Sequence, residues 1–97
     1  MAKGYWIGRI DVHDPEAYKA YVETATPAYR EFGATFLVRG GEFDPVEGQA
    51  RSRNVVIEFP SYEAALACYN SETYRKARAI RQDVSEGELL IIKGHEG

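Results

Sequence analysis

Few residues in this chain of 97 could carry out acid–base chemistry, and they are scattered rather than grouped in a motif. Two arginines are candidates for holding a negative charge. Arg39 comes directly before a pair of glycines, where a β-bulge would aim its guanidinium into a cavity. Arg81 lies at the predicted end of a helix. A guanidinium at either place could anchor a carboxylate or stabilise a developing enolate.

The candidate catalytic residues are Arg39, Glu58 and Tyr74. Arg39 would stabilise negative charge, and Glu58 or Tyr74 would transfer a proton. Glu58 lies within an otherwise apolar segment, where burial would suit a carboxylate to acid–base work. The competing interpretation is a structural ion pair between Glu58 and Arg39, and the cost of burying an unpaired charge favours it. Tyr74 follows an interruption in the second helical region, where a phenol has an apolar body and a polar tip.

Tyr69 and Ser71 lie at the same interruption, and irregular backbone that faces a sheet commonly forms a pocket wall. We therefore treat both as candidate ligand-binding residues, together with Arg81. The alternative is that Ser71 caps a helix while the tyrosines fill the core, and helix caps of this kind are common.

Composition and charge exclude several classes of function. The net charge of −3 and the pI near 5.4 argue against a nucleic-acid partner. The lone cysteine, Cys68, excludes an internal disulfide, and the spacing of the two histidines suggests no metal site. We predict no cofactor. There is no apolar leader and no run of 18 apolar residues, so we expect a cytoplasmic protein without a membrane segment.

The elements that would position these residues follow from periodicity and capping. Alternating or continuous apolar runs predict strands, and apolar residues at helical spacing after Asp14, Ser61 and Ser71 predict helices. The predicted strands cover residues 5–12, 35–39, 53–59 and 89–93, and the predicted helices cover residues 15–32, 62–70 and 72–81. Pro27 predicts a kink or a break in the first helix.

The paired glycines at positions 40 and 41 predict a bulge in the second strand. We expect that strand to continue through Phe43 and Val46 to a turn at Glu47 and Gly48, which would make a long bent hairpin.

This order of elements is a βαββαβ layout, the ferredoxin-like α+β fold, in which the helices cover one face of an antiparallel sheet. We expect one domain over residues 1–97. Several strands carry large apolar residues at both parities, for example Leu90 and Ile91. One apolar sheet face would therefore lie open in a monomer, and we predict a homodimer that pairs through this face.

Five segments of the chain, taken in order, form a specific set of motifs. The segments are Lys3-Gly4-Tyr5-Trp6-Ile7, Asp14-Pro15-x-x-Tyr18-x-x-Tyr21, Phe36-Leu37-Val38-Arg39-Gly40-Gly41, Arg53-Asn54-Val55-Val56-Ile57-Glu58-Phe59-Pro60 and Cys68-Tyr69-Asn70-Ser71-x-x-Tyr74. Together they resemble the domain-of-unknown-function family numbered thirteen-thirty. The resemblance implies the dimeric α+β barrel superfamily, in which two ferredoxin-like sheets form one barrel. It implies no activity, because the family has no established one. Other members of the superfamily include cofactor-free monooxygenases, muconolactone-type isomerases, haem-handling enzymes and amino-acid-sensing domains of transcription regulators. None of their site motifs has a match here.

We therefore weigh three hypotheses. The first is a cofactor-independent enzyme, monooxygenase-like or isomerase-like, that acts on a small anionic or aromatic metabolite in a pocket between sheet and helices. The second is a non-catalytic dimer that binds or senses a small ligand in the same pocket. The third is a partner-binding module, which would need an apolar patch that dimerisation leaves exposed. A perturbed Glu58 in an open cavity would favour the enzyme, and a closed pair of Arg39 with Glu58 would favour the binder.

Overall fold

The computed structural model describes residues 2–96, so Met1 and Gly97, the two ends of the predicted domain, lie outside the described residues. The chain folds into seven elements in the predicted order. They are β1 (Gly4–Val12), α1 (Pro15–Glu31), β2 (Thr35–Arg39), β3 (Arg53–Phe59), α2 (Tyr62–Asn70), α3 (Glu72–Val84) and β4 (Ser85–Lys93).

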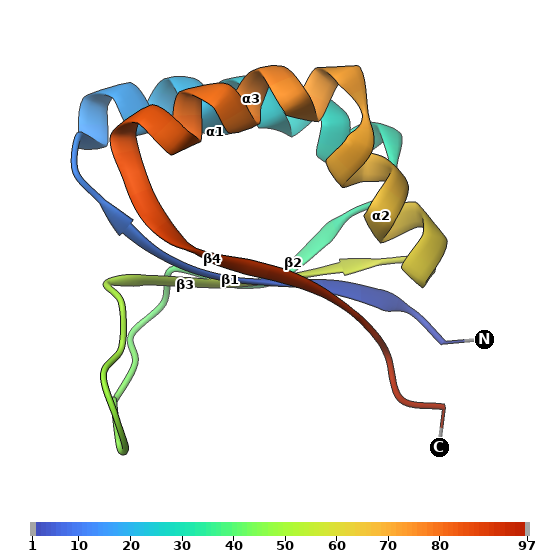
Figure 1. Ribbon diagram of the computed structural model, residues 1–97. Coiled ribbons are helices and arrows are strands. Elements are labelled where there is room, and N and C mark those ends of the chain that lie inside the picture. Colours follow the sequence, from blue (N-terminus) through green and yellow to red (C-terminus); the bar gives the residue numbers. More distant parts are fainter. Residues whose placement is uncertain (1, 97) are drawn as a thin grey trace.

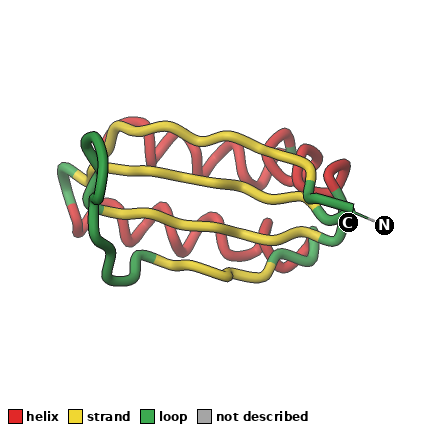
Figure 2. The backbone as a smooth tube through the Cα atoms, turned by 90° about the horizontal axis from the view of Figure 1, so that it is seen from below, coloured by secondary structure: helices red, strands yellow, loops and turns green. Residues whose placement is uncertain are grey.

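The four strands form one antiparallel sheet in the order β2-β3-β1-β4, which is the ferredoxin-like α+β arrangement. All three helices lie on one side of this sheet (Figure 1). The view from the other side shows the strands uncovered, with the helices behind them (Figure 2). The molecule is therefore a two-layer structure with one open sheet face.

The caps that the sequence predicts are present at all three helices. The side chains of Asp14, Ser61 and Ser71 each accept a hydrogen bond from a backbone amide in the first turn of the helix that follows. Ser71 lies between α2 and α3, and it ends the first helix as well as starting the second. The interruption predicted at this point is confirmed.

The core lies between the sheet and the helices, and the parity of each strand determines which side chains enter it. In β1, Trp6 and Ile10 are buried. Trp6 pairs with Ile57 of β3 and Ile91 of β4, so these residues share its face. The alternate residues point to the open face, where Ile7, Leu37, Val38, Leu90 and Ile92 are all exposed. The expectation of apolar side chains at both parities is confirmed.

The predicted long hairpin is wrong. β2 ends at Arg39, and residues 40–52 form a loop that projects from the sheet on the side away from the helices (Figure 1). Gly40 and Gly48 both have positive φ angles within this loop. The register irregularity of β2 falls between Phe36 and Val38 rather than at the glycines, and it places Arg39 opposite Val55 on the helix side.

The predicted start of the last strand is wrong, and of the kink or break predicted at Pro27 the break is absent. α1 runs without a break through Pro27, because a proline within a helix removes one backbone hydrogen bond while the packed face of the helix is retained. β4 begins at Ser85 rather than at residue 89. Its first residues pair with the end of β1, and this tertiary pairing outweighs the weak strand propensity of Ser-Glu-Gly-Glu.

Candidate functional site

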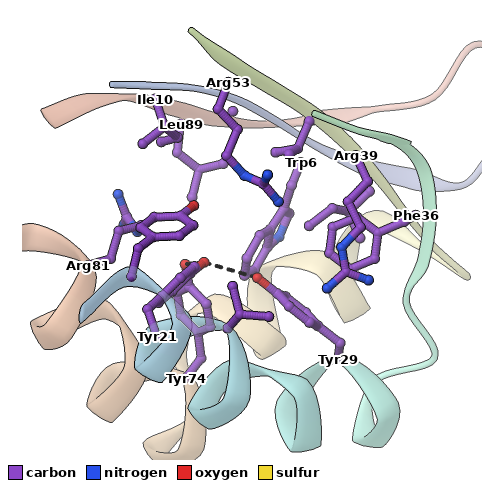
Figure 3. Close-up of a pocket in the computed structure, with 15 residues that line it drawn as sticks. Trp6, Ile10, Tyr21, Tyr29, Phe36, Arg39, Arg53, Tyr74, Arg81 and Leu89 are labelled. Atoms are coloured by element: carbon purple, nitrogen blue, oxygen red, sulfur yellow. Dashed lines mark hydrogen bonds between the residues drawn. The ribbon is translucent and has the colours of Figure 1, made fainter. Parts of the chain in front are cut away.

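A cavity lies between the sheet and the two long helices, with about 480 Å³ of space that no atom fills, part of it open to solvent. The part of this space that admits a water-sized sphere measures about 30 Å³. Gly8 lies on its floor between Trp6 and Ile10, and it adds no side chain there. Around this floor the wall includes four tyrosines and three arginines, namely Tyr18, Tyr21, Tyr29, Tyr74, Arg39, Arg53 and Arg81 (Figure 3).

Three of the tyrosines form a chain of hydroxyl groups. The Tyr21 hydroxyl lies 3.0 Å from the Tyr29 hydroxyl and 2.9 Å from the Tyr74 hydroxyl. Figure 3 shows these tyrosines on the helix side of the cavity, with a dashed line for the bond that reaches Tyr29. Each phenol has one proton to donate, so three hydroxyls that make two bonds retain one proton for another acceptor. The chain can therefore donate a hydrogen bond to an oxygen atom in the cavity.

Burial keeps these phenols in their neutral form. It raises the pKa of Tyr21 well above its ordinary value, and the neighbouring phenols add to the effect. Burial also raises the pKa of Tyr29 and of Tyr74. For Tyr74, the positive charge of Arg81 opposes the rise. At neutral pH the three groups are therefore hydrogen-bond donors and weak acids rather than bases.

Arg81 reaches the cavity from the last turn of α3, and its side chain is 9% exposed. The guanidinium carbon lies 5.9 Å from the ring centre of Tyr21. Its Nε atom is buried without a hydrogen-bond partner. A buried guanidinium is expected to be paired, so this free N–H group marks Arg81 as a residue that can still bind an acceptor.

Arg53 reaches the cavity from the start of β3, where its parity places it on the same side as Val55 and Ile57. Its guanidinium lies 5.6 Å from the ring centre of Tyr18, and its Nε atom is also buried without a partner. The side chain passes over Gly40, where an added Cβ atom would lie 2.7 Å from Nη1 of Arg53. Glycine at position 40 thus leaves room for this arginine.

Arg39 lies at the rim. Its side chain is exposed, and its guanidinium stacks on the ring of Phe36 at 4.1 Å from the ring centre. Among the ion pairs of residues 2–96, none involves any of the three cavity arginines. The described part of the chain also contributes no carboxylate and no imidazole to the cavity wall. The site is therefore positively charged and rich in hydrogen-bond donors.

Glu58 does not reach the cavity. It pairs with Tyr5 across the sheet and points to the open face, where its carboxylate accepts hydrogen bonds from Lys3 Nζ at 3.1 Å and from the Tyr5 hydroxyl at 3.2 Å. The proposed pair of Glu58 with Arg39 is therefore wrong, because the two side chains lie on opposite faces of the sheet. Glu58 cannot decide between an enzyme and a binder in the way the sequence suggested.

Tyr69 and Ser71 also lie outside the cavity wall. Tyr69 packs behind Tyr74, with ring centres 5.7 Å apart, and the guanidinium of Arg78 covers it. The Ser71 hydroxyl accepts a hydrogen bond from the Tyr74 amide and donates one to the Cys68 carbonyl, so its role here is to cap helices. Of the six predicted site residues, the structure brings together Arg39, Tyr74 and Arg81.

Sequence reasoning missed Tyr21, Tyr29 and Arg53. The two tyrosines appear in the sequence only as part of the apolar stripe of α1, although seven tyrosines in 97 residues are unusual. Arg53 had a readable signal, because it shares the parity of Val55 and Ile57 at the start of a buried strand. A charged residue in phase with core residues indicates a side chain that points inward.

Within residues 2–96, three or more His, Cys, Asp or Glu side chains nowhere group closely enough to hold a metal ion. None of the helices in this part of the chain is long and apolar enough to cross a membrane.

Residues 3–95 match the family described as Domain of unknown function (DUF1330). The chain belongs to the DUF1330 family. This confirms the resemblance seen in the five sequence segments. None of the curated protein sequences matches the chain.

Solved structures show the same fold as this DUF1330 chain. A protein of unknown function from Rhodopseudomonas palustris is 19% identical, with a TM-score of 0.77 over 99% of this chain and 85% of that one. SnoaB, a cofactor-independent oxygenase from Streptomyces nogalater, is 10% identical, with a TM-score of 0.65 over 100% and 97%. A dimeric ferredoxin-like protein of unknown function from Thermobifida fusca is 12% identical, with a TM-score of 0.62 over 98% and 92%. At these identities the likeness shows the fold alone.

Proposed function

We propose that this protein binds a small aromatic or conjugated anion in the cavity and acts on it as an enzyme without a cofactor. The observation that carries the proposal is the composition of the cavity wall, which has three arginines, four tyrosines and no carboxylate among the described residues. Guanidinium groups bind carboxylates and enolates, and aromatic walls favour a planar ligand.

The same wall limits the chemistry. It offers donors for an oxyanion but no carboxylate or imidazole base, and the tyrosines stay protonated at neutral pH because burial raises their pKa. The substrate therefore binds as an anion, or it is acidic enough to ionise beside the arginines. The contribution of the protein is to stabilise the negative charge as it spreads over the substrate.

An enolate held in this way has two outcomes. It can take up a proton at another carbon, which is an isomerisation, or it can react with dioxygen, which is an oxygenation. SnoaB is a cofactor-independent oxygenase with the same fold, and this supports the second outcome. In the first outcome the proton leaves to solvent and comes back from solvent, while the Tyr74 hydroxyl, beside Arg81, donates a hydrogen bond to the enolate oxygen.

We also propose that the working unit is a homodimer that pairs through the open face. The exposed apolar side chains of β1, β2 and β4 would be covered in this way, and the dimeric neighbour from Thermobifida fusca supports the proposal. Sedimentation at micromolar concentration should give twice the chain mass of 10.9 kDa. A stable particle of 10.9 kDa would contradict the dimer.

Binding and turnover can be tested with two simple probes. Calorimetric titration with benzoate tests binding, and Arg81→Met should weaken it by about tenfold or more, because a charge-assisted hydrogen bond is lost. Arg75→Met is the matched control, since Arg75 is an exposed residue of the same helix. Failure of benzoate and phenylpyruvate to bind the wild-type protein would refute the site.

Phenylpyruvate, an aromatic anion with an acidic C–H bond, tests the chemistry. In D₂O the protein should accelerate exchange of the benzylic protons, followed by proton NMR, and Arg81→Met should lose the acceleration while Arg75→Met retains it. The second candidate function is a binder that performs no chemistry, and the absence of a base from the described cavity wall favours it. Binding of phenylpyruvate without faster exchange would select this alternative.

A further inference from the structure

We infer that the ligand of this cavity is a dianion, a planar molecule with two separate acidic groups, of which one binds Arg81 and the other binds Arg53. The inference rests on the proposed function, and it names the class of substrate within it. Two buried N–H groups on two opposite walls carry the argument.

The first group is Nε of Arg81, on the helix side. The whole side chain is nine-tenths buried, and this nitrogen has no hydrogen-bond partner. The nearby rings of Tyr21 and Tyr74 offer a π-face and a hydroxyl, but neither carries a negative charge at neutral pH. An isolated buried cation is costly, so the site gains most when an anion enters beside it.

The second group is Nε of Arg53, on the sheet side. It is buried and without a partner, and the guanidinium is directed over the ring of Tyr18. Gly40 lets this side chain keep its position, because a Cβ atom at position 40 would lie 2.7 Å from Nη1 and would push the guanidinium aside. Figure 3 shows Arg53 reaching toward the cavity from the sheet and Arg81 reaching toward it from the helix layer.

The two Nε atoms belong to side chains that reach the cavity from different layers, Arg53 from the sheet and Arg81 from the helices. One carboxylate beside Arg81 leaves Arg53 uncompensated, and the described residues that line the cavity include no acid to take its place. Arg39 does not add a third requirement, because its side chain is exposed and solvent screens its charge. Two charges on the ligand therefore balance the two arginines whose Nε atoms are buried. The aromatic wall between them fits a flat connecting group.

Benzoate and the three benzene dicarboxylates, phthalate, isophthalate and terephthalate, form a matched set of probes. Calorimetric titration at constant ionic strength should show that at least one dicarboxylate binds about tenfold or more tightly than benzoate. The isomer that binds best measures the spacing of the two arginines. If benzoate binds and no dicarboxylate binds more tightly, the inference is overturned and the proposed function stands. If none of the four binds, the inference is overturned, and the proposed function is overturned with it when phenylpyruvate also fails to bind.

Variants assign the two ends of the ligand. Arg53→Met and Arg81→Met should each reduce the advantage of the dicarboxylate over benzoate to about twofold or less, whereas Arg75→Met should retain it, because the control removes the same charge outside the cavity. Arg53→Lys and Arg81→Lys keep the charge and remove Nε, and they should lose most of the advantage even if a methionine variant fails to fold. An advantage that survives in the variants at both positions would refute the assignment.

Discussion

Arg51 on the open face of the sheet has carboxylate partners, whereas Arg53 and Arg81 in the cavity have none among the described residues. On the open face, Arg51 is saturated by acids, with its guanidinium nitrogens 2.7 Å from Asp11 and 2.6 Å from Glu88, and Glu86 at 3.5 Å. In the cavity, Arg53 and Arg81 have no carboxylate partner among the described residues, although both are less accessible to water at Nε than a surface group.

The difference indicates separate roles. Arg51 joins the end of the loop at residues 40–52 to strands β1 and β4, so its positive charge is neutralised by carboxylates of the protein itself. The cavity arginines contribute charge that the fold leaves uncompensated. The chain has more acidic than basic residues, with a net charge of −3, yet no acidic side chain of the described residues lines the cavity. The positive charge of the cavity is therefore available to an anionic ligand.

The difference between paired and unpaired arginines is tested most directly by replacing one arginine of each kind. Arg81→Met should raise the free energy of unfolding of the ligand-free protein by about 1 kcal/mol, because a buried group without a partner is replaced by an apolar side chain of similar length. Arg51→Met should lower it, because three carboxylates lose their shared cation. Urea unfolding followed by circular dichroism measures both. A loss of stability in both variants would contradict the distinction.

The position of Arg53 can be tested through two glycines of the same loop. Gly40 and Gly48 have φ angles of 67° and 73°, so alanine at either place should cost about 1 kcal/mol in the free energy of unfolding. Only Gly40→Ala places a Cβ atom against Arg53, since Gly48 has open space around it. We expect Gly40→Ala alone to reduce the advantage of the best dicarboxylate over benzoate. An equal reduction in both variants would show that the loop, rather than Arg53, controls the site.

The smallest expected effect is the pH dependence of the Arg51 cluster. A backbone hydrogen bond from Ser52 and the Arg51 guanidinium hold the pKa of Asp11 below its ordinary value of 3.8. Arg51 likewise lowers the pKa of Glu88 from 4.5. Both folded values lie below the unfolded ones, so the stabilisation is fully present above about pH 4.5 and is lost as the pH falls through the lowered values.

The difference in unfolding free energy between wild type and Arg51→Met should therefore be constant from pH 7 to pH 5 and shrink at more acidic pH. Urea unfolding at a series of pH values gives this profile. A difference that persists unchanged to pH 2.5 would show that Arg51 acts by packing rather than by charge.

The fold was predictable because its signals are local. Asp14, Ser61 and Ser71 mark three helix starts, and strand parity assigns the faces. The loop at residues 40–52 was not predicted, because apolar residues such as Phe43 and Val46 imitate a strand pattern, whereas a strand also needs a partner with free hydrogen-bonding groups. The pairing of β2 with β3 ends at Arg39, which lies opposite Val55.

The site was predictable only in part. Arg39, Tyr74 and Arg81 were selected from helix and strand ends, which are local features. Glu58 was selected because it lies within an apolar segment, although its position next to the core residue Ile57 already implied that it points to the opposite face. The meeting of the Tyr21 hydroxyl with those of Tyr29 and Tyr74 depends on how α1 packs beside α3, and no spacing within one helix contains that information.

Trp6 has a practical consequence for all of these measurements. It is the single tryptophan of the chain, its indole N–H is fixed by the Ala65 carbonyl at 2.9 Å, and its ring centre lies 4.8 Å from that of Tyr74. All tryptophan fluorescence of this protein therefore originates at the cavity wall. The unmodified protein carries its own optical reporter of site occupancy, and no engineered label is needed to follow a small molecule as it enters or leaves.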